Sequence, residues 1–129
     1  MKRENISSGG KWEPVIGYSR AVKVGAFVYV SGCTAMTPAG LVGKGDVHAQ
    51  MMQSIKTIEA ALKKAGATLK DVVRTRIYLT DIAADSDAAG RAHGEVFGDI
   101  RPALAMVGVA KLIDPDMLVE VEADAVITD

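Results

Sequence analysis

The longest regular pattern of apolar positions predicts an amphipathic helix in the middle of the chain. Apolar residues recur there at steps of four, three, four and three, which places them on one helical face. They are Met51, Ile55, Ile58, Leu62 and Ala65. Asp46 stands where an N-cap accepts a backbone N–H of the first turn, and Gly66 follows the last periodic residue, where a left-handed C-cap is usual. We therefore expect a helix between Asp46 and Gly66 with one face on a core.

Alternating apolar and polar positions predict strands on both sides of this helix. Residues 21–31 alternate, and Gly25-Ala26 is placed to turn between two short antiparallel strands. Residues 73–79 alternate as well. The positions expected on the core side are Val73, Thr75, Ile77 and Leu79, and those expected on the opposite side are Arg74, Arg76 and Tyr78. We expect residues 73–79 to form a strand with one apolar face.

A second helix is predicted from near Ser86 to Phe97. Its Gly90 and Gly94 stand one turn apart. Two glycines at this spacing lower the helix propensity but allow another backbone to approach closely. We therefore expect this helix to pack tightly against a neighbouring element.

Two strands complete the prediction. Pro102 introduces one over residues 103–110, and a turn at residues 114–116 separates it from the last, over residues 119–127. Residues 1–16 read as an irregular lead-in. The order of elements is thus β-β-α-β-α-β-β, which predicts an α+β fold with helices on one face of a sheet.

The other face of this sheet has no predicted cover. By the alternation it carries Arg74, Arg76, Tyr78, Glu120, Glu122 and Asp124. A half-apolar sheet face left bare on so small a domain favours association with further copies of the chain.

Length and composition narrow the class of protein. A chain of 129 residues predicts one domain over 1–129, and 49% hydrophobic content excludes a disordered chain. The net charge of -1 supplies no field for a phosphate backbone, so we expect no nucleic-acid partner. No apolar run approaches a membrane span, no signal-peptide pattern opens the chain, and the single cysteine forms no internal disulfide. We expect a cytoplasmic protein without membrane association.

Six segments together resemble the reactive intermediate deaminase family (Rid, or YjgF-like). Residues 17–25 are similar to the Tyr-Ser-Gln-Ala opening of that family, and residues 30–32 to the Ser-Gly that follows its second strand. The remaining matches are residues 65–73, 78–81, 102–103 and 119–123. The chain is identified as a divergent member, because Leu104 stands where the family carries its signature arginine.

The resemblance implies a chorismate-mutase-like fold with a mixed sheet, assembled as a homotrimer whose sheets face inward. Small-molecule ligands would bind in clefts between subunits. Family enzymes hydrolyse enamines and imines to carbonyl compounds and ammonia, and the resemblance implies no metal and no organic cofactor.

Glu120 matches the glutamate that is thought to position the attacking water in this family. A carboxylate beside a bound iminium suits general-base catalysis, because the cation stabilises the ionised base. The alternative is an exposed strand glutamate or one half of an ion pair between subunits. Sequence alone leaves both interpretations open.

Leu104 cannot bind a substrate carboxylate, and burying an anion without a partner costs several kcal/mol. Arg101 precedes the same strand and is a candidate replacement, with a solvated surface residue as its alternative. Arg74 and Arg76 face the right side of the sheet, but cross-strand or cross-subunit pairing with Glu120, Glu122 or Asp124 is the favoured explanation for them. A less charged substrate is a further possibility.

The other residues expected to line the cleft are Tyr18, Ser31, Cys33, Thr34 and Met106. Tyr18 matches a cleft tyrosine of the family, although a buried tyrosine with one hydrogen bond is equally ordinary. We expect Cys33 to be inert, because no cation or helix N-terminus beside it is evident. His48 and His93 lack metal-ligand spacing, so no metal site is expected.

Two functions from different classes follow. The first is a trimer that hydrolyses enamines or imines with Glu120, and the second is a non-catalytic binding or chaperone-like trimer. Ribonuclease activity, attached to some members of the family, is disfavoured because the sequence offers no His-His or His-Lys catalytic pair.

Overall fold

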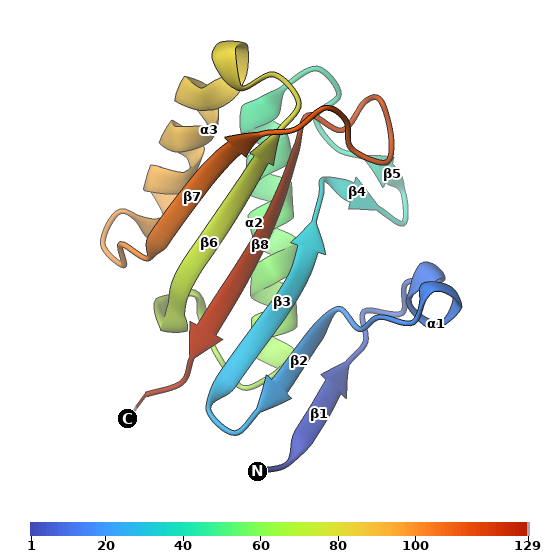
Figure 1. Ribbon diagram of the computed structural model, residues 1–129, viewed down its shortest axis with the longest axis vertical. Helices are drawn as coiled ribbons and strands as arrows, with labels where there is room; N and C mark the ends of the chain where they lie inside the picture. The colour runs from blue at the N-terminus through green and yellow to red at the C-terminus, as the bar shows by residue number, and fades with distance from the viewer. Residues whose placement is uncertain (129) are drawn as a thin grey trace.

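The computed structural model describes residues 1–128 and contains a six-stranded mixed sheet (Figure 1). Its elements follow in the order β1 (Arg3–Ile6), α1 (Trp12–Ile16), β2 (Ala21–Val24), β3 (Phe27–Cys33), β4 (Met36–Thr37), β5 (Gly40–Leu41), α2 (Val47–Lys64), the 3₁₀ turn η1 (Leu69–Asp71), β6 (Val72–Leu79), α3 (Ile82–Phe97), β7 (Ala103–Gly108) and β8 (Val119–Val126). The strand order is β1-β2-β3-β8-β6-β7, and β4 pairs with β5 apart from it. Only β6 and β7 run parallel within the described sheet.

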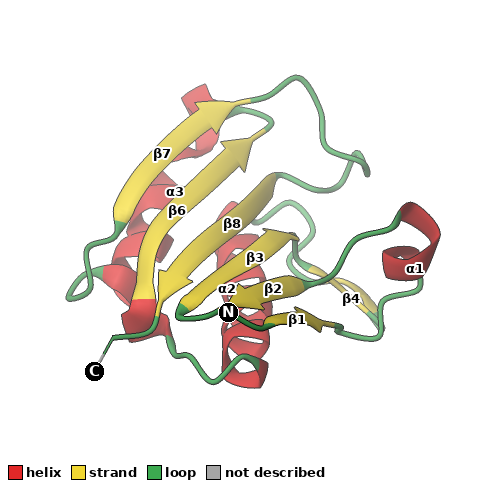
Figure 2. Cartoon of the chain, turned by 60° about the horizontal axis from the view of Figure 1, so that its bottom comes forward, coloured by secondary structure: helices red, strands yellow, loops and turns green. Residues whose placement is uncertain are grey.

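Helices α2 and α3 lie on the same face of the sheet (Figure 2). α2 packs on β3 and β8, and α3 packs on β6 and β7. The largest side chains of the core between them are Phe97, Met51, Ile58, Leu62, Ile77 and Leu79. The mixed α+β architecture expected from the sequence is therefore confirmed.

The predicted central helix is α2. The Asp46 carboxylate accepts a hydrogen bond from the Ala49 N–H at 3.0 Å, so it is the N-cap. Gly66 has a φ of 82°, the left-handed conformation that ends a helix without the steric cost a side chain would bring. The turn at Gly25-Ala26 also joins two antiparallel strands, β2 and β3, as expected.

Residues 1–16 are not irregular, which corrects the expectation for the lead-in. β1 pairs antiparallel with β2 at the sheet edge, and α1 is a single turn of helix. Only Ile6 of β1 is buried, and α1 exposes Trp12, Val15 and Ile16. Elements this short and this exposed leave no periodic apolar signal, because they bury too few side chains.

Strand β6 contains a bulge that moves one predicted core residue to the surface. The pairing with β8 shifts between Val72 and Arg74, so Val72 is buried and Val73 is 48% exposed. Thr75, Ile77 and Leu79 face the core as expected. A bulge adds one residue to one strand, so the strict alternation expected for Val73 does not hold.

Helix α3 begins at Ile82, four residues before the predicted start. Asp81 is its N-cap and accepts a hydrogen bond from the Ala84 N–H at 3.1 Å. The expected close approach of a backbone at Gly90 and Gly94 is wrong. A Cβ at Gly94 would meet nothing within 4 Å, and one at Gly90 would meet only the Met106 methyl at 4.0 Å.

The face away from α2 and α3 carries the polar residues predicted for it. Tyr78 pairs with Glu120, Arg76 with Glu122, and Arg74 with Asp124. Arg76 lies 3.3 Å from Asp124 and 3.5 Å from Glu122, and the Tyr78 hydroxyl donates a hydrogen bond to Glu122. We call this surface the open face, and it also exposes Phe27 and Tyr29 of β3.

The two ends of the described chain meet at one end of the sheet. Arg3 of β1 pairs with Val24, and Phe27 pairs with Val126 of β8, so the first and last strands begin and finish beside the turn between β2 and β3 (Figure 1). Residues 31–33 and Glu120 lie at the opposite end of β3 and β8.

Candidate functional site

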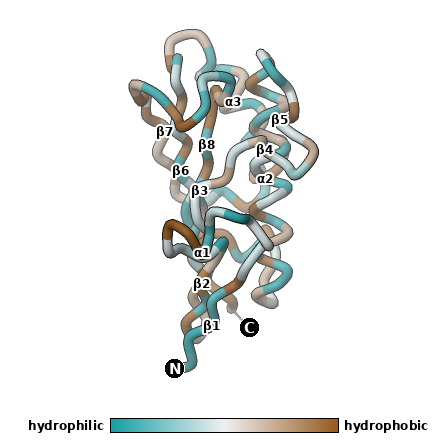
Figure 3. Tube along the Cα trace, turned by 90° about the vertical axis from the view of Figure 1, so that its right-hand side faces the viewer, coloured by the Kyte–Doolittle hydropathy of each residue, from teal (hydrophilic) through white to brown (hydrophobic). Residues whose placement is uncertain are grey.

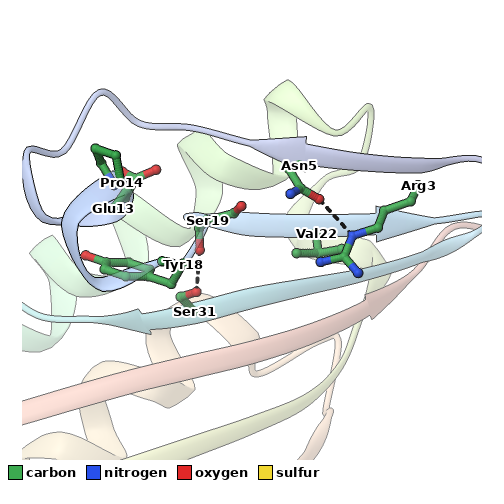
Figure 4. A pocket seen from close by; sticks show the side chains of 9 residues that line it. Arg3, Asn5, Glu13, Pro14, Tyr18, Ser19, Val22 and Ser31 are labelled. Carbon is green, nitrogen blue, oxygen red and sulfur yellow. Dashed lines mark hydrogen bonds between the residues drawn. The ribbon is translucent and has the colours of Figure 1, made fainter.

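The site centres on the end of β3, where regular strand pairing stops. β2 pairs with β3 only as far as Ala21 and Val30, and the register with β8 shifts between Val30 and Cys33. The Ser31 N–H still donates to the Arg20 carbonyl at 2.9 Å, and the Ser31 hydroxyl donates to the Ser19 carbonyl at 2.6 Å (Figure 4). The backbone of residues 31–33 is thus held in place although one side of it has no strand.

Glu120 packs directly on this stretch of backbone. A Cβ at Gly32 would lie 2.0 Å from the Glu120 Oε2 atom, so a side chain at this position would displace the carboxyl group from where it lies. The side chain is half-buried. Burial raises the pKa of the Glu120 carboxyl, the nearby Glu122 raises it further, and Arg20 opposes both. A carboxyl whose pKa is shifted toward neutrality is suited to exchange protons with a substrate or water.

Arg20 is a part of this site that sequence reasoning missed. Its Nη1 donates to the Gly32 carbonyl at 2.8 Å and lies 3.5 Å from the Cys33 sulfur. Its Cζ lies over the Tyr18 ring, 5.5 Å from the centroid, and its Nη2 is 3.4 Å from the Tyr18 hydroxyl. The Nε atom is buried and has no hydrogen-bond partner. One signal was available, because the resembling family carries glutamine at this position of its Tyr-Ser-Gln-Ala opening.

Cys33 is an interior thiol beside the same guanidinium. It is 2% exposed, and burial raises its pKa, although Arg20 acts in the opposite direction. Its sulfur donates to the Ser31 carbonyl at 3.3 Å. A thiol of raised pKa is a weak nucleophile, but the reason given for an inert Cys33 is wrong, because the Arg20 cation does lie beside it.

A groove of about 440 Å³ opens beside these residues (Figure 4). Its walls are Arg3, Asn5, Glu13, Pro14, Gly17, Tyr18, Ser19, Val22 and Ser31. Glu13 is buried there, yet hydrogen bonds from Ser8 and Gly10 outweigh the burial and lower the pKa of its carboxyl. Of the predicted cleft residues, Tyr18 and Ser31 border the groove, and Glu120 is not part of its wall.

The predicted site residues on β7 lie elsewhere in the chain. Leu104 pairs with Thr75 and Met106 with Ile77, and both of these partners point toward the helices. Glu120 pairs instead with Tyr78 on the open face, and β8 and β6 separate β3 from β7. Arg101 is exposed just before β7, with a φ of 57°. One chain therefore does not bring Leu104, Met106 or Arg101 to Glu120.

Thr34 and the two histidines have local partners. The Thr34 hydroxyl accepts a hydrogen bond from the Met36 N–H at 3.3 Å. His93 is buried on α3, with its Nε2 2.9 Å from the Thr75 hydroxyl, and His48 pairs with Glu95 at 3.0 Å on the helical side. Neither histidine is placed to act with Glu120.

Residues 1–128 contain neither a metal-ligand cluster nor a helix suited to cross a membrane. No group of three or more His, Cys, Asp or Glu side chains is arranged to hold a metal ion. None of the helices within that range combines the length and the apolar character that crossing a membrane requires.

The chain is similar in sequence and in structure to known proteins. The family model described as endoribonuclease L-PSP matches residues 10–127. The 3-aminoacrylate deaminase RutC of Acinetobacter baylyi is 36% identical over 126 residues, which are 97% of this chain and 98% of that protein. The crystal structure of Rv2704 from Mycobacterium tuberculosis, described as a member of the YjgF/YER057c/UK114 family, has a TM-score of 0.89 and 48% identity, and the match covers 98% of this chain and 100% of that one.

Proposed function

The chain belongs to the Rid, or YjgF-like, family, and we propose that it hydrolyses small enamines or imines to carbonyl compounds and ammonia. The observation that carries the proposal is Glu120, a half-buried carboxyl with a raised pKa on the Gly32 backbone. The deaminase named among its relatives acts on 3-aminoacrylate, an enamine, which supports this class of reaction.

The proposed chemistry needs one proton-transferring group. An enamine first takes a proton at carbon from solvent, which regains one when the carbonyl forms, and becomes an iminium ion. Water then attacks the iminium carbon while Glu120 accepts a proton from it, and the electron pair of the C=N bond moves to nitrogen. Glu120 returns the proton to that nitrogen, ammonia leaves, and the carbonyl forms as the remaining hydroxyl loses its proton. A carboxyl of raised pKa suits both transfers, because it accepts a proton more readily than an ordinary glutamate and can still return it.

We further propose that the working form is a homotrimer with its ligand between subunits. The open face exposes the large apolar side chains Phe27 and Tyr29, and contact with a second copy would bury them. Leu104 and Met106 lie on the opposite face from Glu120 within one chain. A cleft lined by Leu104 and Met106 as well as by Glu120 therefore needs β7 from one subunit and β8 from another.

Loss of the Glu120 carboxylate is the direct test. Imines are generated from several amino acids by an amino-acid oxidase, and release of the oxoacid is followed with and without the protein. We expect Glu120→Gln to lower the accelerated rate by about 100-fold or more, because the general base is lost. Glu95→Gln, which removes a carboxylate contacting only His48, is the matched control and should keep full activity.

The pH dependence provides a second readout from the same assay. Activity that requires ionised Glu120 should rise with pH through an inflection above 4.5, the ordinary value for the glutamate pKa. Equal activity of wild type and Glu120→Gln would contradict the proposed role.

The alternative function is a trimer that binds small metabolites without converting them. Leu104 favours it, because an apolar side chain stands where the resembling enzymes hold a cation. No acceleration of any imine, together with measurable binding of oxoacids, would establish this alternative. Cleavage of RNA that survives Glu120→Gln would instead point to the activity in the name of the family model.

A further inference from the structure

We propose that Arg20 is the anion-binding group of this site and that the ligand it takes is a small carboxylate, such as a 2-oxo or 2-imino acid. The part that concerns hydrolysis rests on the proposed function, whereas the binding itself does not. The inference starts from the hydrogen bonds that the guanidinium makes and leaves unmade.

One edge of the Arg20 guanidinium is free. A guanidinium presents two edges that can hold a carboxylate with two parallel hydrogen bonds, and Nε with Nη2 forms one of them. Nε has no partner, and the only partner of Nη2 among the described residues is the Tyr18 hydroxyl at 3.4 Å. That contact lies at the surface, so a ligand can reach the Nη2 end of this edge by displacing one weak hydrogen bond, and Nε becomes available when the residues that cover it move aside.

The unpaired Nε also calls for a physical explanation. Leaving a buried N–H without an acceptor costs about 1–3 kcal/mol, so such groups are rare unless a ligand or water completes them. A carboxylate on the free edge would accept from Nε and Nη2 together. Binding would thus remove an existing penalty as well as form new hydrogen bonds.

The rest of the guanidinium is already fixed in place. Nη1 donates to the Gly32 carbonyl at 2.8 Å, and the Tyr18 ring lies along the cation. The Arg20 backbone carbonyl is held by the Ser31 N–H at 2.9 Å. A group ordered before the ligand arrives loses little conformational entropy on binding.

The charge of Arg20 is not used by any ion pair within residues 1–128. The cations found in ion pairs there are Lys44, His48, Arg76 and Arg91. Glu120 influences Arg20 through space but lies beyond ion-pair distance. A positive charge is not needed merely to satisfy the Gly32 carbonyl, because the neutral amide of a glutamine side chain is also a donor. The arginine is therefore explained better by an anion that visits the site.

Arg20 also lies near the proposed general base, Glu120. Both Arg20 and Glu120 contact Gly32, the first at its carbonyl and the second at its Cα side. A carboxylate held on Arg20 would bring the adjacent C=N or C=O carbon of a 2-imino or 2-oxo acid toward the Glu120 carboxyl. Arg20 would then supply the anion recognition that Leu104 cannot.

The test compares an anion with its neutral ester. Pyruvate and methyl pyruvate are titrated into the wild-type protein and into Arg20→Gln, Arg20→Lys and Arg91→Gln, with the dissociation constants taken from NMR shifts. We expect pyruvate to bind the Arg20→Gln protein at least about tenfold more weakly, because hydrogen bonds to charged groups are the stronger ones. Methyl pyruvate binding should change little, Arg20→Lys should recover part of the loss, and Arg91→Gln, on an exposed helix position, should match wild type.

A spectroscopic readout protects the test against a variant that fails to fold. In arginine-labelled wild-type protein, pyruvate should shift the Nε–H resonance of Arg20, and methyl pyruvate should not. Equal pyruvate affinity in wild type and Arg20→Gln would overturn the inference, and so would an unmoved Nε–H resonance at saturating pyruvate or the absence of pyruvate binding to wild type.

Hydrolysis measurements separate this inference from the proposed function. Arg20-dependent pyruvate binding without any imine hydrolysis would overturn the enzymatic proposal and leave the anion site standing. Hydrolysis of carboxylate imines that is unchanged in Arg20→Gln would overturn the anion site alone. Glu120→Gln that binds pyruvate but has lost hydrolysis would support both.

Discussion

His93 shows at the residue scale how burial restricts a protonation state. It is 8% exposed, its only polar partner among the described residues is Thr75, and desolvation lowers the pKa of its imidazole. The folded protein therefore resists a proton that the unfolded chain accepts near its ordinary pKa of 6.5. Between the two values the unfolded state binds more protons, so the free energy of unfolding falls as the pH is lowered below about 6.5.

We expect His93→Gln to remove this part of the acid sensitivity. The free energy of unfolding in urea, measured at about pH 7.5 and pH 5.5, should fall less in His93→Gln than in wild type, with a single group contributing at most about 1.4 kcal/mol per pH unit. Ala60→Gln, which adds no titratable group at an exposed position of α2, is the control and should keep the wild-type slope. An identical slope in wild type and His93→Gln would show that other groups dominate.

Gly94 lowers the stability of helix α3, and its substitution tests this effect on a single element. Gly94 is exposed in α3, and a Cβ there would meet nothing within 4 Å. Alanine has a higher helix propensity because glycine loses more backbone entropy on folding. We expect Gly94→Ala to raise the free energy of unfolding by about 0.5–1 kcal/mol, measured as a higher urea midpoint at unchanged slope.

The contrasting position is Gly66, after the end of α2. Its φ of 82° suits glycine and strains alanine, so Gly66→Ala should lower the same free energy of unfolding. Stabilisation by alanine at both positions would mean that backbone conformation is not the deciding factor.

The elements that sequence predicted well are those that bury many side chains at one period. α2 turns six apolar residues to the core, and both Asp46 and Gly66 have the expected cap geometry. The predicted start of α3 is four residues too late because Ile82 and Ala83 are apolar yet exposed, so the first turn breaks the amphipathic pattern. Val73 was misplaced because a bulge depends on the pairing of two strands, and no single strand reveals it.

The candidate site was predictable only in part, for a related reason. Glu120 lies on a regularly alternating strand, so its position off the core could be read from its neighbours Val119 and Val121. Arg20 reaches the Gly32 carbonyl only because β2 stops at Ala21 and leaves that side of β3 unpaired. Such a contact depends on where the pairing of two strands ends. Neither strand propensity nor the alternation of apolar residues determines that point.

At the scale of the whole molecule, the exposed open face predicts that the protein associates with further copies of itself. Tyr29 is 50% exposed on a sheet surface without a helical cover. If three copies bury this face, wild type should sediment at about 40 kDa, three times the 13.5 kDa chain. We expect Tyr29→Glu to shift the protein toward monomer, because a buried charge without a partner is strongly unfavourable.

Ala60→Glu is the control for this substitution. Ala60 is exposed on α2, on the helical side of the sheet, so the same new charge should leave the sedimentation of wild type unchanged. A wild-type protein that sediments as a monomer at micromolar concentration would contradict the trimer.

Two segments outside the sheet also expose large apolar side chains. α1 appears as a brown segment beyond the sheet in Figure 3, and its Trp12, Val15 and Ile16 are exposed. Ile113, in the loop between β7 and β8, is 89% exposed. Contact with a second copy at either segment would bury these apolar side chains.

The shared location of the first and last strand ends has a practical consequence. An affinity tag, a fluorophore or a surface tether attached at either terminus would project from the end of the sheet remote from Arg20 and Glu120. A fusion placed after β8 should therefore leave Arg20 and Glu120 accessible, whereas a fusion placed before β1 starts beside Arg3, which borders the groove.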